Sequence, residues 1–284
     1  MKAGEASYRP ACCCCPQNGW NDIFLACSRE RAGLLTVPAV HRAAIVLDFL
    51  ASCSDPVSFG QMAATMDMPR SSLHNVCMAL LDTGLIERGA DGRFQIGLRV
   101  VELARARLSK TELVGTFLET CREVGGIGET LVLGVLSGVD VVYVAVINAD
   151  RPLAVRYQIG MRLPAWSTAT GKAILSTLGE ANVKQLLTTA SSDSRAKVAG
   201  PDLETLLAEL AVTQKRGYSI DDEETARGMV CIGVPIFEDN EDQARSAIAF
   251  SMVKASAKPF STDLTSKLTV LADTISRRLG SAPR

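Results

Sequence analysis

The chain has 284 residues, of which 47% are hydrophobic, so it is long and apolar enough for about two domains of roughly 150 residues and is not globally disordered. Its 30 Lys and Arg residues nearly balance its 31 Asp and Glu residues. This balance excludes a uniformly basic nucleic-acid coat protein but leaves room for a local basic face. Only two histidines, His41 and His74, are present, which makes a histidine-rich zinc enzyme or a histidine-dependent triad hard to build.

The nine cysteines do not have the even count and regular spacing of a disulfide framework, which favours a reducing cytoplasm. Four of them form the run Cys12–Cys15, where adjacent side chains alternate in direction, so we expect no metal site and no cofactor. The longest apolar stretch, Leu131–Ile147, is broken by Ser137, Gly138 and Asp140. It therefore predicts two strands and a turn, and we expect a cytoplasmic protein with no membrane partner.

Residues 1–36 have no helical or strand period and mix Pro, Gly, Asn and Cys with charged residues. We expect this segment to be a disordered leader, or the product of a start codon assigned too far upstream.

From Val37 the sequence becomes periodic, and helices are expected over 37–53, 58–66 and 71–83. Ser58 and Ser71 are the expected N-caps of the second and third helices, and Gly84 suits the position just after the third. A hairpin with strands 85–88 and 93–96 follows around a glycine-rich turn. This order of elements predicts a winged helix-turn-helix over residues 37–97.

In such a motif the third helix presents its outer face to the major groove, and the hairpin reaches the flanking backbone. Asn75 can pair in a bidentate manner with adenine, and the serine hydroxyls can reach phosphates or base edges. The candidate DNA-binding residues are Arg70, Ser71, Ser72, His74 and Asn75 on the helix, with Arg88 and Arg93 on the hairpin.

The charge of this region is close to neutral, since eight Lys and Arg residues face seven Asp and Glu residues between Val37 and Lys110, a net charge of +1. Non-specific DNA affinity should therefore be modest, and dimerisation should matter for tight binding. A winged helix that serves only protein contacts is the alternative.

A cation-rich linker helix is expected over 98–110, followed by a second domain over 111–281. That domain has the pattern of an antiparallel sheet flanked by helices, so the fold class is α+β. Strands are expected over 129–136, 139–147, 153–159, 229–237 and 246–253, and helices over 113–124, 167–178, 202–216 and 262–279.

Three features of the second domain could carry chemistry. Thr170-Gly171-Lys172 lacks the earlier glycine of a phosphate-binding loop, because Trp166 stands there, but a helix start offers N–H groups to a small carboxylate. The acidic run Asp221–Glu224 is typical of a solvated loop. Cys231 lies in an apolar run with no histidine nearby to activate it, so we expect no enzymatic activity.

Three separated segments together resemble the signature of the IclR-type transcriptional regulators. They are Leu163–Ala173, which contains Ala169-Thr170-Gly171-Lys172, then Gly217–Glu224, and then Gly228–Phe237 with Cys231-Ile232-Gly233. The winged helix matches the family too, so the resemblance extends over about residues 37–279. It implies a ligand-responsive DNA-binding regulator, a repressor that forms dimers or tetramers, with a GAF-like effector domain.

The resemblance also implies the partners: a double-stranded DNA operator, a second copy of the chain, and a small organic acid or aromatic metabolite. By motif position, the effector-binding residues are Ala169, Thr170, Asp221, Cys231, Ala249 and Ser251. Trp166 replaces a frequent histidine and Ala249 a serine, which implies a bulkier or less polar ligand than a two- or three-carbon oxoacid. Asn75 replaces the usual arginine and implies a different operator preference. The alternative function is a small-molecule enzyme fused to a winged helix.

Overall fold

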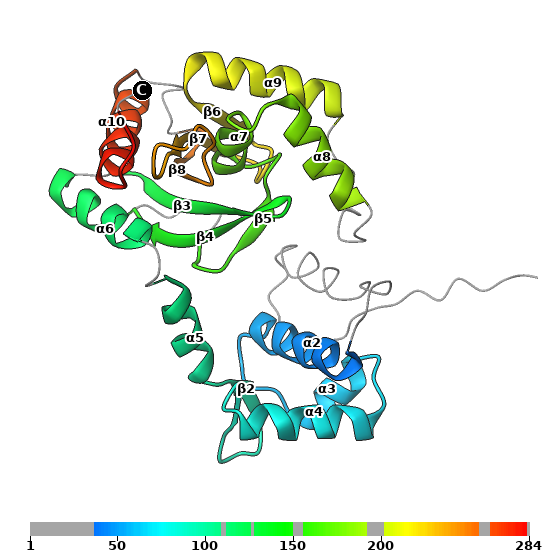
Figure 1. Cartoon of the computed structure of the whole chain (residues 1–284). Coiled ribbons are helices and arrows are strands. Elements are labelled where there is room, and N and C mark those ends of the chain that lie inside the picture. Colours follow the sequence, from blue (N-terminus) through cyan, green and yellow to red (C-terminus); the bar gives the residue numbers. More distant parts are fainter. Residues whose placement is uncertain are drawn as a thin grey trace, which may run out of the picture. The chain divides into compact units, whose positions relative to one another are not determined.

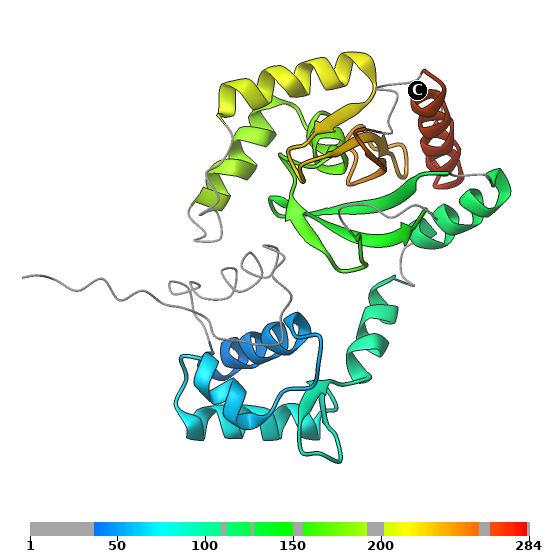
Figure 2. The ribbon, with the colours of Figure 1, turned by 180° about the vertical axis from the view of Figure 1, so that it is seen from behind.

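The computed structural model describes residues 37–108, 112–125, 128–149, 156–191, 202–255 and 262–282. The contacts divide the chain between Arg107 and Leu108 into two compact units, and each unit is described by itself (Figure 1, Figure 2). The expected leader, residues 1–36, lies outside the described residues. None of the helices within the described ranges combines the length and the apolar character needed to cross a bilayer.

The first unit begins with three helices and a hairpin, as expected from the sequence. The elements are α2 (Pro38–Ser52), α3 (Phe59–Thr65), α4 (Arg70–Asp82), β1 (Ile86–Arg88) and β2 (Phe94–Ile96). Ser58 caps α3 in a capping box with Gln61, which confirms the predicted N-cap. The predicted cap of α4 is wrong, because Pro69 is its N-cap and Ser71 lies inside the first turn.

Gly84 ends α4 in a Schellman motif, as its position after the helix predicts. Its φ of 69° is left-handed, its N–H donates to the carbonyl of Leu81, and the N–H of Leu85 donates to that of Leu80. The chain then enters the hairpin, whose second strand, β2, also pairs with Val57 through two backbone hydrogen bonds to Phe94. These bonds hold the hairpin against the helices, over the apolar core formed by Val46, Leu50, Met62, Leu73, Cys77, Leu80, Ile86 and Phe94.

The linker is helical, as predicted, and forms α5 (Arg99–Leu108), none of whose residues is buried. The N–H of Leu98, just before the helix, donates to the carboxylate of Glu87 on β1. Leu98, Val101 and Leu103 are all more than half exposed, so α5 presents apolar as well as cationic side chains.

The second unit is a six-stranded antiparallel sheet with the strand order β5-β4-β3-β8-β7-β6. Its strands are β3 (Thr130–Ser137), β4 (Asp140–Ile147), β5 (Arg162–Pro164), β6 (Ser219–Asp222), β7 (Met229–Ile236) and β8 (Ser246–Val253). Its helices are α6 (Glu112–Val124), α7 (Ala169–Leu175), α8 (Glu180–Ser191), α9 (Leu203–Arg216) and α10 (Thr262–Arg278). The predicted α+β class is therefore confirmed.

Three elements differ from the sequence prediction. Of the expected strand 153–159, residues 153–155 lie outside the described residues and 156–159 form no strand; the strand in this region is β5. Helix α8 and strand β6 were not predicted. Strand β6 could not be predicted because it ends in Asp221 and Asp222, and aspartate is rare in strands.

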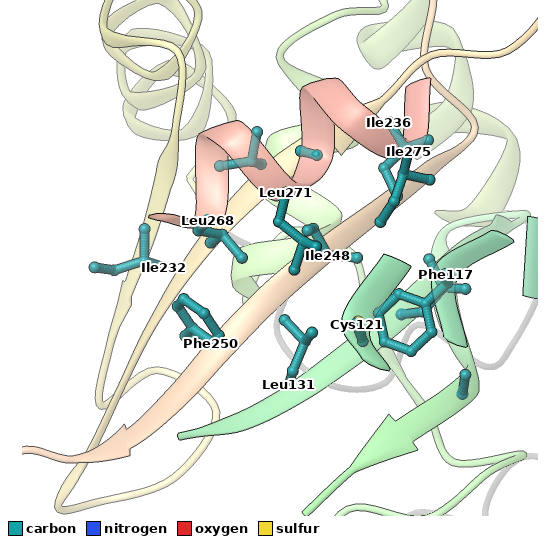
Figure 3. Close-up of a cluster of buried hydrophobic side chains, with 14 of the residues drawn as sticks. Phe117, Cys121, Leu131, Ile232, Ile236, Ile248, Phe250, Leu268, Leu271 and Ile275 are labelled. Carbon is teal, nitrogen blue, oxygen red and sulfur yellow. The ribbon is translucent and has the colours of Figure 1, made fainter. Parts of the chain in front are cut away.

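One face of the sheet packs against α6 and α10 and forms the main apolar core. Figure 3 shows side chains of both helices, such as Phe117 and Leu271, meeting Leu131, Ile248 and Phe250 from the strands. This core stabilises the unit by removing apolar surface from water.

The other face of the sheet packs against α7, and glycines make the close approach possible. A Cβ at Gly233 would lie 2.4 Å from the carbonyl oxygen of Ala169, and one at Gly171 would lie 2.1 Å from that of Ala165. Because both clashes are with backbone atoms, no side-chain movement relieves them. Gly233 lets α7 lie directly on β7, and Gly171 lets α7 lie against the segment that follows β5.

A β-bulge in β4 divides its side chains between the two faces. Tyr143 pairs with Gly134, while Ala145 pairs with the preceding residue, Leu133, so Val144 is the extra residue. Ala145 therefore lies in the core on the α6 and α10 side, whereas Tyr143 shares the α7 face with Gly134. Without the bulge, the two residues would lie on the same face.

Candidate functional site

The outer face of α4, the candidate DNA-reading face, is exposed along the helix. Arg70, Ser71, His74 and Asn75 are exposed, whereas Ser72 is only partly exposed because it borders the buried side. The buried side consists of Leu73, Cys77 and Leu80. Within the described ranges no hydrogen bond restrains the Asn75 amide, so it is free to pair with a base edge.

The two hairpin arginines are exposed but already have partners on the hairpin. The Arg88 Nε donates to the carbonyl of Gly92 at 3.0 Å, and its guanidinium lies over the ring of Phe94. The Arg93 Nε lies 3.4 Å from the Asp91 carboxylate. Asp91 therefore offsets part of the charge that Arg93 would offer to a phosphate.

The polar candidate effector residues form a row across three strands on the α7 face. Asp221 on β6 lies opposite Cys231 on β7, and Cys231 lies opposite Ser251 on β8. Thr130 on β3 continues the row beside Ser251. All four side chains are at most 5% exposed, so this is a polar row inside the protein.

The remaining candidates lie directly beside this row. Ala169 and Thr170 begin α7, and the carbonyl of Ala169 accepts a hydrogen bond from Ser219 of β6. Ala249 lies opposite Gly233, the glycine beneath Ala169. The structure therefore brings all six predicted effector residues together. The Thr170 hydroxyl is buried and faces the Tyr143 phenol, whose pKa its hydrogen bond lowers.

Of the N–H groups at the start of α7 that were expected to receive a carboxylate, that of Gly171 is already taken. It donates to the side chain of Thr168, the N-cap, at 3.1 Å. A carboxylate at this position remains a prediction.

Two tyrosines that were not predicted from the sequence complete the cluster. The Tyr157 hydroxyl accepts a hydrogen bond from Ser251 at 3.0 Å and lies 3.7 Å from the Cys231 sulfur. Its ring meets that of Tyr143 edge-on, with the centroids 5.5 Å apart. Burial raises the pKa of both phenols, so they stay protonated at neutral pH.

Asp221 is held by the loop that follows it. Its carboxylate accepts N–H bonds from Glu224 at 2.9 Å and Thr225 at 3.2 Å, and the Thr225 hydroxyl donates to the carbonyl of Ser167, just before α7. Burial raises the pKa of Asp221, although the hydrogen bonds from Thr225 and Glu224 and the charge of Lys172 oppose that rise. The effector candidate thus joins β6 to the start of α7.

The solvated-loop interpretation of the acidic run is correct for only part of it. Asp222, Glu223 and Glu224 are exposed, and the first two pair with Lys254, whereas Asp221 is buried. Partial desolvation of its carboxylate raises the pKa of Glu224.

Lys172 holds the carboxylate of Glu224. Its ammonium is fully buried and lies 2.6 Å from Glu209 on α9 and 2.5 Å from Glu224. The side chain that resembled a phosphate-loop lysine is therefore neutralised by two carboxylates, and it fastens α7 to α9 and to the acidic loop.

The cluster lacks the groups of a nucleophilic or metal centre. Burial raises the pKa of the Cys231 thiol to about 12, and the nearby Asp221 charge adds to the rise, so the thiolate is scarce at neutral pH. Across the described ranges, no three His, Cys, Asp or Glu side chains are grouped so as to hold a metal ion.

Two family models match the chain. One, the IclR helix-turn-helix domain, covers residues 39–90, and the other, "Bacterial transcriptional regulator IclR C-terminal", covers residues 106–277. The chain is 30% identical over 219 residues to the "Probable transcriptional regulator SauR" of Cupriavidus necator, a match that covers 76% of this chain and 86% of that protein.

Solved structures share the fold. The repressor BlcR of Agobacterium tumefaciens is 34% identical, with a TM-score of 0.53 over 87% of this chain and 99% of BlcR. An IclR homolog from Microbacterium hydrocarbonoxydans, solved in complex with 4-hydroxybenzoate, is 20% identical, with a TM-score of 0.71 over 85% of this chain and 98% of that one.

Proposed function

Because the chain belongs to the IclR family of bacterial transcriptional regulators, and is thus a DNA-binding regulator modulated by a small molecule, we propose which of its residues read DNA and which bind the effector. The outer face of α4 enters the major groove, and Asn75 pairs with adenine there. Arg70, Ser71, Ser72 and His74 contact phosphates or neighbouring base edges, while Arg88 and Arg93 of the hairpin contact the flanking backbone.

The effector binds on the α7 face of the sheet, in contact with Ala169, Thr170, Asp221, Cys231, Ala249 and Ser251. The observation that carries this proposal is the convergence of these residues from α7, β6, β7 and β8 on one buried polar row. The 4-hydroxybenzoate bound by the Microbacterium homolog fits an aromatic or organic-acid effector.

The protein acts as a cytoplasmic repressor that binds its operator as a dimer or a dimer of dimers. Repression is supported by the similarity to BlcR, which is a repressor, and self-association by the exposed apolar side chains of α5 and by the low net charge of the first unit. Two recognition helices on a palindromic operator would double the few phosphate contacts that one chain offers.

The alternative is an enzyme fused to a winged helix, and a turnover assay separates the two. A sensor binds its effector and releases it unchanged, whereas an enzyme consumes it. The protonated Cys231 and the neutralised Lys172 favour the sensor. We therefore expect no loss of any bound carboxylate or phenol during incubation with the protein.

The test of the effector site compares two neighbouring acids. With the metabolite that most raises the melting temperature in a panel of phenols and carboxylates, Asp221→Ala should weaken binding by about tenfold, because a buried polar contact is lost. Operator affinity without the metabolite should stay unchanged. Asp222→Ala, one residue along but exposed, is the matched control and should alter neither quantity.

Fluorescence anisotropy with operator DNA and calorimetry with the metabolite give the two affinities. Asp221→Asn keeps an oxygen that can accept the loop N–H groups, so it carries the test if the alanine variant does not fold. Equal loss of DNA binding and ligand binding would show that Asp221 is structural.

A further inference from the structure

Tyr157 inserts a phenol among the candidate effector residues. Its side chain is 3% exposed, and its hydroxyl contacts two of them, Ser251 and Cys231. The Cys231 thiol in turn donates to Ser251 at 3.3 Å. Each of these three groups can donate one hydrogen bond and accept another, so they form a closed ring.

The backbone around Tyr157 does not belong to this interior. Arg156, Gln158 and Ile159 are exposed, and Ile159 is 66% exposed. The turn that follows is held on β4, where the N–H of Gly160 donates to the carbonyl of Tyr143. Among the described residues 156–160, only Tyr157 is buried, so its side chain can leave without any strand being broken.

We propose that Tyr157 is a built-in occupant of the effector site, and that the effector is a phenol which replaces the Tyr157 side chain on Ser251 and Cys231. This inference rests on the proposed function and refines it. Tyr157 then selects the class of ligand that binds, because any effector must make the contacts that the tyrosine gives up.

The charges around Ser251 and Cys231 favour a neutral phenol over an anion as the ligand. Ser251, Cys231 and Tyr143 are uncharged, because burial raises the pKa of the thiol and of the phenol. Lys172, whose charge acts on Asp221, is already paired with two carboxylates, and Asp221 adds a third acid. A group that both donates and accepts a hydrogen bond without a charge suits this position, and a phenol hydroxyl is such a group.

Shape leads to the same ligand class. The site holds an aromatic ring in the structure, with the Tyr143 ring edge-on against it. A free phenol placed there would keep the edge-on aromatic contact and both polar partners of the Tyr157 hydroxyl.

The test measures binding of 4-methylphenol, which is the tyrosine side chain without its backbone, to the full chain by calorimetry. Tyr157→Phe removes the two polar contacts that hold the occupant in place but keeps its ring. Displacement then becomes easier, so we expect 4-methylphenol to bind about fivefold more tightly than to the native chain. Tyr143→Phe is the matched control: it removes the hydroxyl of the other buried tyrosine and should not tighten binding.

A second variant tests the displacement directly. Tyr157→Ala should bind 4-methylphenol, and the ligand should raise its melting temperature. The control is Phe117→Ala, which empties an aromatic position on the opposite face of the sheet. In this control, 4-methylphenol should leave operator binding unchanged. If Tyr157→Ala does not fold, Tyr157→Phe alone decides. With 3-fluorotyrosine incorporated, the Tyr157 fluorine resonance of the native chain should move toward its solvent-exposed position when 4-methylphenol binds.

Several results would overturn the inference. They are weaker binding to Tyr157→Phe, unchanged binding, or no binding to any of the chains at about 10 mM, since an occupied phenol site must accept a phenol when its occupant is loosened. Ser251→Ala separates the two levels of the proposal. If it abolishes the response to a metabolite of the panel while Tyr157→Phe changes nothing, the effector site stands and Tyr157 only packs; if neither matters, the site itself is wrong.

Discussion

The two candidate sites of this protein use polar side chains in opposite ways. On α4 the polar residues face solvent, and within the described ranges the Asn75 amide has no hydrogen-bond partner. On the α7 face of the sheet the polar residues are buried and bonded to one another, as in the ring of Tyr157, Ser251 and Cys231. The first site is ready for a partner, whereas the second already fills its hydrogen bonds internally.

Because of this difference, substitutions at the two sites should affect folding and binding differently. An exposed polar residue can change without altering the folded state, so substitutions on α4 should act on DNA binding alone. A buried polar residue contributes to folding as well as to ligand binding, because removing it leaves its partners unsatisfied. A ligand at the second site must therefore exchange its own contacts for those that exist, which links its binding to the arrangement of α7 and the strands.

The largest expected effect on stability is that of Lys172→Met. This change keeps most of the volume but leaves Glu209 and Glu224 close together without their cation. We expect a loss of about 2–3 kcal/mol in the free energy of unfolding, less than for fully buried pairs because both carboxylates keep some contact with water. Urea unfolding, followed by the fluorescence of Trp166 near α7, measures it.

The control for Lys172 is Lys184→Met on α8, whose ion pair with Glu180 is exposed. It should change the stability by less than about 0.5 kcal/mol. Adding Glu209→Gln and Glu224→Gln to Lys172→Met should recover part of the loss. A similar loss of unfolding free energy for both lysine variants would contradict the expected difference between a buried and an exposed ion pair.

The next effect concerns the exposed polar residues of α4. Asn75→Ala should weaken operator binding by about 2 kcal/mol with little change on random DNA or in the unfolding free energy. Arg70→Ala is the paired variant: as a phosphate contact, it should weaken binding to both DNAs equally and reduce the salt slope by about 1. Titrations by fluorescence anisotropy at several salt concentrations measure both, and an equal loss on both DNAs for Asn75→Ala would refute direct base reading.

Local patterns in the sequence were enough to predict the first unit. The capping box at Ser58 and the Schellman glycine at Gly84 depend only on residues a few positions apart, so the sequence reveals them. The cap of α4 was misassigned because Ser71 is a better cap by residue type than Pro69, whereas the turn places Pro69 at the helix boundary.

The second site was predicted only in part, because its geometry depends on long-range pairing. The family motif indicated Asp221, Cys231 and Ser251, and the register across β6, β7 and β8 aligns them. Tyr143 reaches this face through a bulge that no local pattern reveals, and Tyr157 lies outside any strand. One hint was available: these are two of only four tyrosines in the chain.

The most direct test of the account is binding of the purified full chain to the DNA that flanks its own gene. Fluorescence anisotropy at low ionic strength would be recorded with and without a panel of phenols and small carboxylates. The account predicts salt-dependent binding that random DNA competes poorly, and a change in affinity with at least one metabolite that also stabilises the protein. Equal affinity for the flanking and random DNA, unaltered by every metabolite, would contradict it.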